Sequence, residues 1–186
     1  MALIRGDNRK NTLIGTAAAD TIFGLADIDV LQGGNGNDLL DGGTGNDTLI
    51  GGWGNDTFII DGSAEIVTEL TGQGTDVVHA SVNHTLAANV EVLLLLGAAL
   101  NGTGNALANT ITGNALSNKI DGGAGGDKLI GGLGNDTYVV GSALDMVTES
   151  MGQGTDAVLA WINHTLAANV EVLTLLGSAQ NGTGNA

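Results

Sequence analysis

Large apolar residues recur at every ninth position near the start of the chain. Because successive side chains of a strand point to opposite faces, the middle residue of a short strand faces one way and its neighbours face the other. Each recurrence therefore predicts a three-residue strand with one core side chain. The glycine-rich segments between them predict turns, since glycine readily takes positive φ angles. The predicted core positions are Leu13, Ile22, Leu31, Leu40, Leu49 and Phe58, with Ile111 and Ile120 farther along.

Three such units follow one another without a break at residues 33–41, 42–50 and 51–59, and further acidic units stand at residues 122–130 and 131–139. Each begins with a glycine-rich turn that has aspartate at its sixth position. A short fixed period predicts a solenoid. The alternative, a glycine-rich flexible linker, does not explain the apolar residue in every unit. The fold class we expect is all-β, a parallel β-roll or β-solenoid.

Two units make one coil of 18 residues, so aspartates 18 positions apart lie on the same side of the solenoid. Asp20, Asp38 and Asp56 form one predicted column, and Asp29 and Asp47 form another. Carboxylates stacked about 4.8 Å apart repel one another unless a cation lies between them. The available ligands are hard oxygens of carboxylates and turn carbonyls, and about six to eight such oxygens favour Ca²⁺. The sequence therefore predicts several calcium ions.

These nonapeptides resemble those of the repeats-in-toxin (RTX), or hemolysin-type, calcium-binding family. The resemblance implies a parallel β-roll with one ion between each pair of stacked turns. It also implies that the carbonyls of positions one to four and the aspartate at position six are the ligands, each aspartate serving two ions. Together with Asp20 and Asp29, the implied metal ligands are Gly33, Gly34, Asn35, Gly36, Asp38, Gly42, Gly43, Thr44, Gly45, Asp47, Gly51, Gly52, Trp53, Gly54, Asp56, Gly122, Gly123, Ala124, Gly125, Asp127, Gly131, Gly132, Leu133, Gly134 and Asp136.

Degraded units keep the apolar position but lose other features of the motif. Residues 6–32 carry Asn11 at one aspartate position and lack several glycines, so we expect an N-terminal cap in which ion binding fades. Residues 104–121 carry Asn109 and Asn118 in place of aspartate. We expect these turns to stack through their amides with little or no calcium.

A longer repeat interrupts the nine-residue rhythm. Residues 51–106 align without gaps on residues 131–186, and 37 of the 56 positions are identical. Valines flanked by glycine and asparagine turns predict two or three wider rungs that continue the solenoid. Residues 86–88 (Leu-Ala-Ala) are expected to form a short helical corner. A separate globular insert is the alternative, although about 45 residues with few aromatics would bury little core.

The expected organisation is one continuous solenoid in four parts. Two nonapeptide blocks are joined by the wider rungs. The parts are a first roll block with its cap at residues 1–60, a linking unit at 61–103, a second nonapeptide block at 104–140 and a second copy of the linking unit at 141–186.

Acidic residues also recur inside the linking unit. They either close a calcium site where this unit meets the regular coils or are ordinary solvated acids, and the pattern leaves both interpretations open. The residues are Glu65, Glu69 and Asp76, with their equivalents Asp145, Glu149 and Asp156.

Composition agrees with a metal-dependent solenoid. The chain has 32 glycines, no cysteine, 20 acidic residues against five basic ones and a formal net charge of −15. This balance argues against nucleic acid and anionic membranes as partners, and the lack of cysteine removes disulfides and thiolate metal sites. The most apolar run, residues 90–100, is far shorter than the roughly 20 residues that cross a bilayer. No cleaved signal peptide is visible in residues 1–12.

Catalytic motifs were not found: the sequence lacks both His-Glu-x-x-His and Gly-x-Ser-x-Gly. The three histidines are expected to be partly buried, hydrogen-bonding structural residues, since His84 and His164 fall at equivalent positions of the long repeat and His79 stands apart from both. We therefore expect a non-enzymatic module that is disordered without calcium and folds on binding it.

The resemblance implies a secreted bacterial protein, exported by a type I route, in which this chain is joined to the rest of a larger protein. The chain ends within a repeat, so we expect a fragment whose uncapped end could pair with another copy. The alternative function is an adhesive or carbohydrate-binding accessory module of an extracellular enzyme or surface adhesin. Its aromatic platform would have to come from Trp53, Trp161 and Tyr138.

Overall fold

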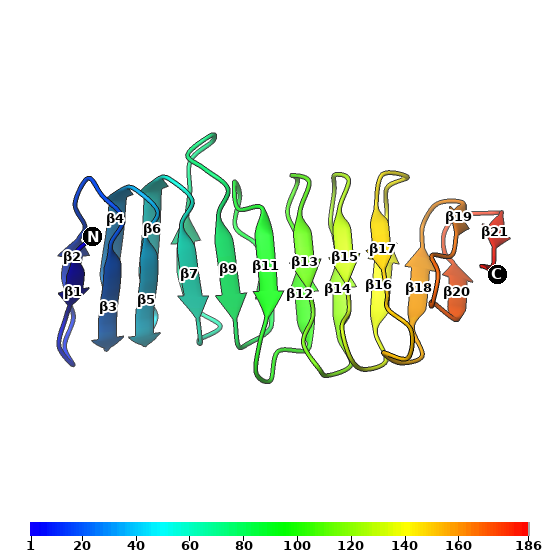
Figure 1. Cartoon of the computed structure of the whole chain (residues 1–186), viewed down its shortest axis with the longest axis horizontal. Helices are drawn as coiled ribbons and strands as arrows, with labels where there is room; N and C mark the ends of the chain where they lie inside the picture. Colours follow the sequence, from blue (N-terminus) through cyan, green and yellow to red (C-terminus); the bar gives the residue numbers. More distant parts are fainter. Residues whose placement is uncertain (186) are drawn as a thin grey trace.

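The computed structural model describes residues 1–185, and within them it contains only strands and turns. The strands wind into a parallel β-solenoid of about 10 turns, and the two ends of the chain lie at opposite ends of its long axis (Figure 1). The all-β, parallel solenoid expected from the sequence is confirmed. No helix of the described chain is long and apolar enough to span a membrane.

Each coil up to β16 places one strand in a nine-stranded sheet and one in a four- or six-stranded sheet. The nine-stranded sheet contains β1 (Leu3–Arg5), β3 (Thr21–Ala26), β5 (Leu39–Thr44), β7 (Thr57–Ile60), β9 (Val77–Ala80), β11 (Val92–Leu95), β13 (Thr110–Thr112), β15 (Lys128–Ile130) and β17 (Met146–Thr148). The four-stranded sheet contains β2 (Thr12–Ile14), β4 (Val30–Asn35), β6 (Thr48–Trp53) and β8 (Ile66–Thr68). The six-stranded sheet contains β10 (His84–Thr85), β12 (Asn101–Thr103), β14 (Lys119–Asp121), β16 (Thr137–Val140), β18 (Ala157–Ala160) and β20 (Val172–Leu175), and β19 (His164–Thr165) pairs with β21 (Gly182–Thr183).

One apolar side chain per strand fills the interior of the nonapeptide coils, as the nine-residue pattern predicts, whereas strands of the linking units such as β9 and β11 bury two. Along the nine-stranded sheet the register aligns Ile22 with Leu40, Leu40 with Phe58 and Phe58 with Val78, and all four are fully buried. The opposite face aligns Ile120 with Tyr138, also fully buried. The core is therefore a pair of stacked rows, and each coil is stabilised by burial against its two neighbours.

The expected helical corner at residues 86–88 is wrong. The backbone N–H of Leu86 donates to the carbonyl of Thr103 on the next coil, at 2.9 Å. Because this N–H is already bonded to another coil, it cannot donate to the carbonyl four residues earlier, as an α-helix requires. Asn89 turns the chain with a φ of 66°, and the same turn recurs at Asn169 with a φ of 62°.

Coil lengths change where the long repeat interrupts the nonapeptides. The register steps by 18 residues from β5 to β7, by 20 from β7 to β9, by 15 from β9 to β11 and by 18 from β11 to β13. The second copy repeats the steps of 20 and 15 from β16 to β18 and from β18 to β20. The linking unit is thus built into the solenoid, and its two extra residues bulge out as a loop.

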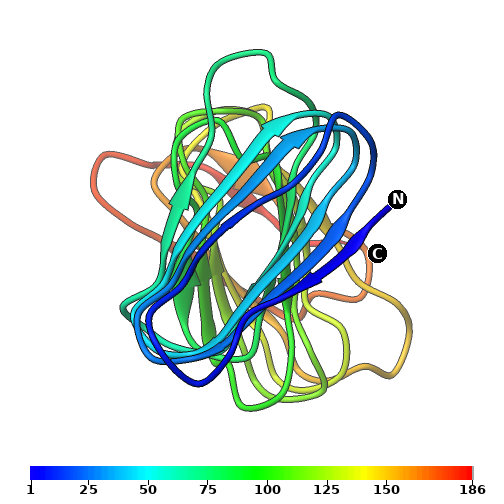
Figure 2. The ribbon, with the colours of Figure 1, turned by 90° about the vertical axis from the view of Figure 1, so that its left-hand side faces the viewer.

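The 80-residue repeat spans a half-integral number of coils. Strand β7 belongs to the nine-stranded sheet, whereas its equivalent β16 belongs to the six-stranded sheet. Equivalent features therefore lie on opposite sides of the solenoid. The two long loops, residues 70–75 and 150–155, project in opposite directions when the solenoid is seen end-on (Figure 2).

The turn geometry is imposed even where glycine has been lost. The second and fourth residues of the clear units have positive φ at every position except Gly45, as at Gly34 (105°) and Gly36 (111°). In the degraded unit the same two positions are Leu25 (93°) and Asp27 (76°). Positive φ strains residues that carry a Cβ. The unit at residues 24–32 therefore keeps the backbone of the clear units at a local cost.

We expect replacement of Ile120 by alanine to lower the free energy of unfolding by about 2–5 kcal/mol, because it opens a cavity in the stacked core. Urea unfolding at saturating calcium measures the loss. Lys119→Ala is the matched control, since Lys119 is the exposed neighbour on the same strand, and its effect should stay within about 0.5 kcal/mol. Equal losses for both variants would contradict the stacked-core description.

Candidate metal centre

Buried aspartates form continuous columns that link each coil to the one before it. The backbone N–H of Asp20 donates to Oδ1 of Asp38 at 2.7 Å, that of Asp38 donates to Oδ1 of Asp56 at 2.7 Å, and that of Asp56 donates to Oδ1 of Asp76 at 2.8 Å. Asp76 in turn donates to Oε2 of Glu91 at 2.9 Å. Each carboxylate therefore accepts a charge-assisted hydrogen bond from the preceding coil.

The same bond recurs in the other columns. Asp29 donates to Oδ1 of Asp47 at 2.7 Å. In the second block, Asp136 donates to Oδ1 of Asp156 at 2.7 Å, and Asp156 donates to Oε2 of Glu171 at 2.7 Å. All of these bonds point the same way, from the amide of one coil to the carboxylate of the next. The predicted columns are thus present and extend into the linking units.

The second oxygen of most of these carboxylates has no partner. The aspartates are between 0 and 2% exposed, so water does not satisfy these oxygens. A buried carboxylate oxygen without a donor is costly, which points to a missing cation. The unpartnered aspartate atoms are Oδ2 of Asp29, Asp38, Asp47, Asp56, Asp127 and Asp136.

The first glycine of each unit leaves room for these oxygens. A Cβ at Gly33 would collide with Oδ2 of Asp38 and with the carbonyl oxygen of Gly51 on the next coil. Similarly, a Cβ at Gly122 would collide with Oδ2 of Asp127. Carboxylate and carbonyl oxygens therefore converge on a space that no side chain can enter. An all-oxygen donor set of this kind fits Ca²⁺.

The remaining predicted ligands take distinct places in the turn. The first glycine and the aspartate of each clear unit are buried, whereas the side chain at the third position is exposed, so that residue can offer only its carbonyl to the column. The buried first positions are Gly33, Gly42, Gly51, Gly122 and Gly131, and the exposed third positions are Asn35, Thr44, Trp53, Ala124 and Leu133. The second and fourth positions are Gly34, Gly36, Gly43, Gly45, Gly52, Gly54, Gly123, Gly125, Gly132 and Gly134, most of them with positive φ.

The cap columns are partly satisfied without metal. Asp20 accepts from the amides of Ala2 and Thr16 and from the Thr16 hydroxyl, at 2.5, 2.6 and 2.7 Å. These bonds, of which the Ala2 bond is the strongest influence, lower the pKa of Asp20. Asp29 differs, because its Oδ2 has no partner. Of the two column aspartates in the cap, Asp20 and Asp29, only Asp29 presents the orphaned oxygen found in the clear units.

Burial raises the pKa of the acids at the end of the first block. The pKa of Asp56 rises to about 6, mainly through burial, with the charges of Asp38 and Asp76 adding to it. That of Glu69 rises to about 7, through burial and then Asp76, and that of Glu65 rises to about 8, through burial and then Asp61. Burial thus makes these carboxylates take up protons at a higher pH than usual, and a bound cation would compete with those protons.

Asparagine replaces this arrangement in the middle of the chain. The side-chain Nδ2 of Asn118 donates to the carbonyl of Ala99 at 3.0 Å, and its Oδ1 accepts the backbone N–H of Asn114 at 2.8 Å. Asn109 is satisfied in the same way by Val90 and Asn105, at 3.1 and 2.8 Å. Each amide thus cross-links two coils through its own donor and acceptor. These turns are hydrogen-bonded without the orphaned oxygen of the acidic turns.

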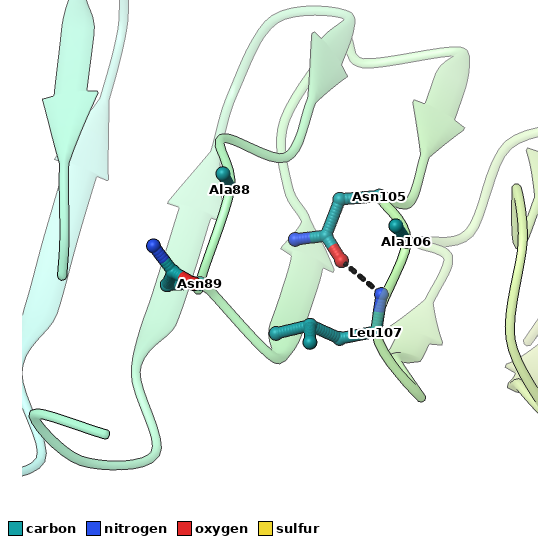
Figure 3. A pocket seen from close by; sticks show the side chains of 5 residues that line it. All are labelled: Ala88, Asn89, Asn105, Ala106 and Leu107. Carbon is teal, nitrogen blue, oxygen red and sulfur yellow. Dashed lines mark hydrogen bonds between the residues drawn. The ribbon is translucent and has the colours of Figure 1, made fainter. Parts of the chain in front are cut away.

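A second asparagine strengthens each of these turns. Asn105 donates to the carbonyls of Ala87 and Val90, both at 2.7 Å, while its Oδ1 accepts the backbone N–H of Leu107 at 2.8 Å (Figure 3). A small surface recess is lined by these turn residues and by Ala88 and Asn89. None of its lining residues is titratable, so this recess is separate from the acidic columns.

Several of these features could not be read from the sequence pattern. Glu91 and Glu171 extend the columns, but they follow the preceding aspartate by 15 residues instead of 18, which hides them from a fixed period. Asp145 is already satisfied by the amides of Asp127, Gly141 and Ser142. The sequence feature that could have identified the two glutamates is their position immediately before a strand, which the column aspartates share.

The equivalent histidines His84 and His164 lie in β10 and β19 and are partly buried, as expected. The hydrogen bonding expected of them is not seen, because Nε2 of each is buried without a partner. The structure does not bring these two residues together. The long repeat spans a half-integral number of coils, so it places His84 and His164 on opposite sides of the solenoid.

Fold and site together define a parallel β-roll whose coils meet at buried, oxygen-rich turns that could hold metal ions. The family model of the RTX calcium-binding nonapeptide repeat matches this chain in four copies, over residues 5–27, 23–58 and 103–138. The chain therefore carries RTX calcium-binding repeats, as its sequence predicts. No curated protein matches the chain.

In the absence of calcium, we expect the fold to gain stability as the pH falls from 8 to 6.5. A carboxyl whose pKa is raised by folding favours the folded state when protonated; this contribution is complete below the unfolded pKa, about 4, and is lost as the pH rises through the folded value. For Asp56, Glu69 and Glu65 the folded values are about 6, 7 and 8. The β signal of the chain in chelator, followed by circular dichroism at each pH, measures the trend, because a more stable fold raises the folded fraction of a largely disordered chain.

Two histidines lower the stability of the fold as the pH falls, which opposes the effect of the carboxylates. Burial lowers the pKa of His84 and His164 from the ordinary value of 6.5, so their protonation favours the unfolded chain. The double variant His84→Leu/His164→Leu should therefore continue to gain stability below pH 6.5, where the parent chain levels off. A β signal in chelator that decreases from pH 8 to 6.5 would contradict the carboxylate assignment.

Replacing Asn118 by aspartate should convert a metal-independent turn into one that needs calcium. The substitution removes the donor to Ala99 and sets a carboxylate against that carbonyl, which should cost about 1–3 kcal/mol in chelator. Saturating calcium should recover most of this loss. Thermal unfolding with and without calcium tests both halves, and Ala115→Asp, which adds the same charge at an exposed position of the same turn, is the control. A loss that calcium does not reduce would contradict the exchange of amide for ion.

Proposed function

We propose that this chain is a calcium-binding structural module whose acidic coils become ordered when calcium fills the columns. The observation that supports this most directly is the row of buried aspartates that each keep one oxygen without a partner. The family resemblance supplies the ion, and the all-oxygen donor set fits it. The proposed ligands are the position-six aspartates together with the carbonyls of positions one to four in the clear units.

Within each column the carboxylate would have two tasks. Its Oδ1 holds the amide of the preceding coil, as Asp38 does for Asp20 at 2.7 Å. Its free Oδ2 would bind the ion near the carbonyl of the next coil, as Asp38 lies near Gly51. The bound ion would supply positive charge between stacked carboxylates. The aspartate therefore fixes the coil spacing with one oxygen and offers a ligand with the other.

The same arrangement explains why folding would depend on the metal. Without an ion, stacked carboxylates must be buried against one another, and a chain with 32 glycines loses a large conformational entropy on folding. Calcium removes the first cost and cross-links neighbouring coils, so its binding free energy becomes folding free energy. The acidic blocks would be the metal-dependent part.

The asparagine turns would behave differently. Asn109 and Asn118 already satisfy the coil interfaces at residues 104–121 through amide hydrogen bonds. This segment would need no ion and would form a permanent join between the two acidic blocks. Calcium dependence would then be strongest on either side of it.

The setting we propose is a secreted bacterial protein, since RTX repeats occur in such proteins. Extracellular calcium modules bind at about 10⁻⁴–10⁻³ M, so a module of this type would remain open in a low-calcium cytosol and fold outside the cell. Type I export and attachment to a larger protein follow from the family alone. We assign the chain a structural role.

The adhesive alternative has little support in the arrangement of aromatic residues. Tyr138 is fully buried, whereas Trp53 and Trp161 are 62% and 55% exposed. The two tryptophans lie at opposite halves of the solenoid, about six coils or roughly 29 Å apart along its axis. They therefore do not form a shared stacking platform.

The test is a calcium titration of the metal-stripped chain, followed by far-ultraviolet circular dichroism. We expect a cooperative gain of β signal with calcium and little gain with magnesium, because Mg²⁺ demands a smaller octahedral shell and dehydrates reluctantly. Asp38→Asn/Asp47→Asn should shift the midpoint to higher calcium, while Asp7→Asn, which removes an exposed charge, should not. A chain that is fully folded in chelator would show that calcium does not control folding.

A further inference from the structure

Glu69 and Glu149 stand where a glycine carbonyl is expected in the regular coil. In the regular units, the carbonyl of the first glycine approaches the first glycine of the preceding coil, as Gly51 approaches Gly33. Eighteen residues after Gly51 the chain has Glu69, and 18 residues after Gly131 it has Glu149. A Cβ at Gly51 would collide with Oε1 of Glu69, so the carboxylate itself has moved into this position.

In the second copy the glutamate joins two aspartates in a buried cluster. One carboxylate oxygen from each of Asp136, Glu149 and Asp156 lies within 4.8 Å of the others, and all three residues are buried. Oε2 of Glu149 and Oδ2 of Asp136 have no partner. Glu149 is only 8% exposed, and its unpartnered Oε2 is itself buried.

The first copy has the equivalent residues Asp56, Glu69 and Asp76, which are 0, 5 and 1% exposed. Oε1 of Glu69 and Oδ2 of Asp56 both lie beside Gly51, and the backbone N–H of Asp56 donates to Oδ1 of Asp76, although among the described residues only the second copy brings all three carboxylates within 4.8 Å of one another. Oε2 of Glu69 and Oδ2 of Asp56 are again unpartnered. The next coil fixes the glutamate backbone, because Asn89 donates to the carbonyl of Glu69 at 2.9 Å. Asn169 does the same for Glu149 at 3.0 Å. The carboxylates are thus held in place by the fold.

We propose that Asp56, Glu69 and Asp76, and likewise Asp136, Glu149 and Asp156, form two calcium sites of higher affinity than the nonapeptide sites. This inference rests on the proposed function and adds to it a ligand from outside the nonapeptide motif. Calcium affinity increases with the number of charged ligands and with the rigidity of the site. These sites have three carboxylates where two stacked turns have two. They lie at the bases of the two long loops, so the acidic blocks would load from these ends first.

The two sites differ in one neighbouring residue. The hydroxyl of Tyr138 donates a hydrogen bond to Oε1 of Glu149, whereas the first copy has Phe58 at the equivalent position. The hydroxyl partly satisfies Glu149 in the empty site and reduces the charge available to the ion. The site at Glu69 therefore binds calcium more tightly than the site at Glu149.

The test is a competition titration of the metal-stripped full chain with calcium against a fluorescent calcium chelator. We expect two tight equivalents followed by a weaker class. Glu69→Gln and Glu149→Gln should each weaken one tight equivalent by about tenfold or more, since the amide keeps the shape and loses the charge. Asp29→Asn should affect only the weaker class, and the charge-matched Asp7→Asn should affect neither.

The outcomes separate this inference from the function on which it rests. A parent chain that binds several ions in one uniform class, or glutamine variants that keep both tight equivalents, would overturn the glutamate sites and leave calcium binding by the nonapeptides intact. A parent chain that binds no calcium would overturn both.

A second pair of variants preserves the carboxylates and so avoids loss of folding. Phe58→Tyr should weaken the tighter equivalent by up to about tenfold, and Tyr138→Phe should strengthen the other by a similar factor. Each residue already fits the equivalent position of the other copy, where both are fully buried. Tight equivalents that do not respond to either exchange would contradict the placement of the ions beside these glutamates.

Discussion

The structure depends on the burial of carboxylates between coils that are only one strand spacing apart. A carboxylate in this position must receive a hydrogen bond, a proton or a cation, because it has no access to water. The fold supplies one amide donor per aspartate, always from the preceding coil, as Asp20 donates to Asp38. That bond fixes the coil spacing and leaves the second oxygen for an ion. The first glycine of each unit follows from the same constraint, since a Cβ would occupy the space of that oxygen.

The chain uses two chemically distinct solutions to this problem. Asp136 keeps an oxygen free for a cation, whereas Asn118, one coil earlier, uses a neutral amide to bridge the same gap. Both side chains have nearly the same shape, so the backbone path is unchanged. The two side chains differ in what makes the contact between coils favourable. The amide finds its hydrogen-bond partners when the coils pack together, whereas the carboxylate also needs a counter-charge. Alternation of the two types divides one uniform fold into segments with different requirements.

The sequence predicts the roll well because its period is local and fixed. The core row through Leu40 and Phe58 and the aspartate columns follow from counting in nines and eighteens, and the structure confirms both. The linking units are harder to predict because their coils have 20 and 15 residues and so depart from the 18-residue period. A fixed period of 18 therefore does not identify Glu91 as a column member. The non-helical corner at Leu86 depends on a hydrogen bond to another coil, which the local sequence does not show. The backbone strain at Leu25 could not be predicted from the sequence either, because the neighbouring coils impose its positive φ angle.

The half-integral length of the long repeat has a consequence for how such chains can grow. One 80-residue unit contains four full coils and one additional strand segment, so adding or deleting a single unit rotates everything beyond it by half a turn. Two units restore the original orientation. Any surface feature downstream is therefore sensitive to the parity of the number of repeats, and duplication in pairs is the change that preserves which side of the molecule a given residue faces.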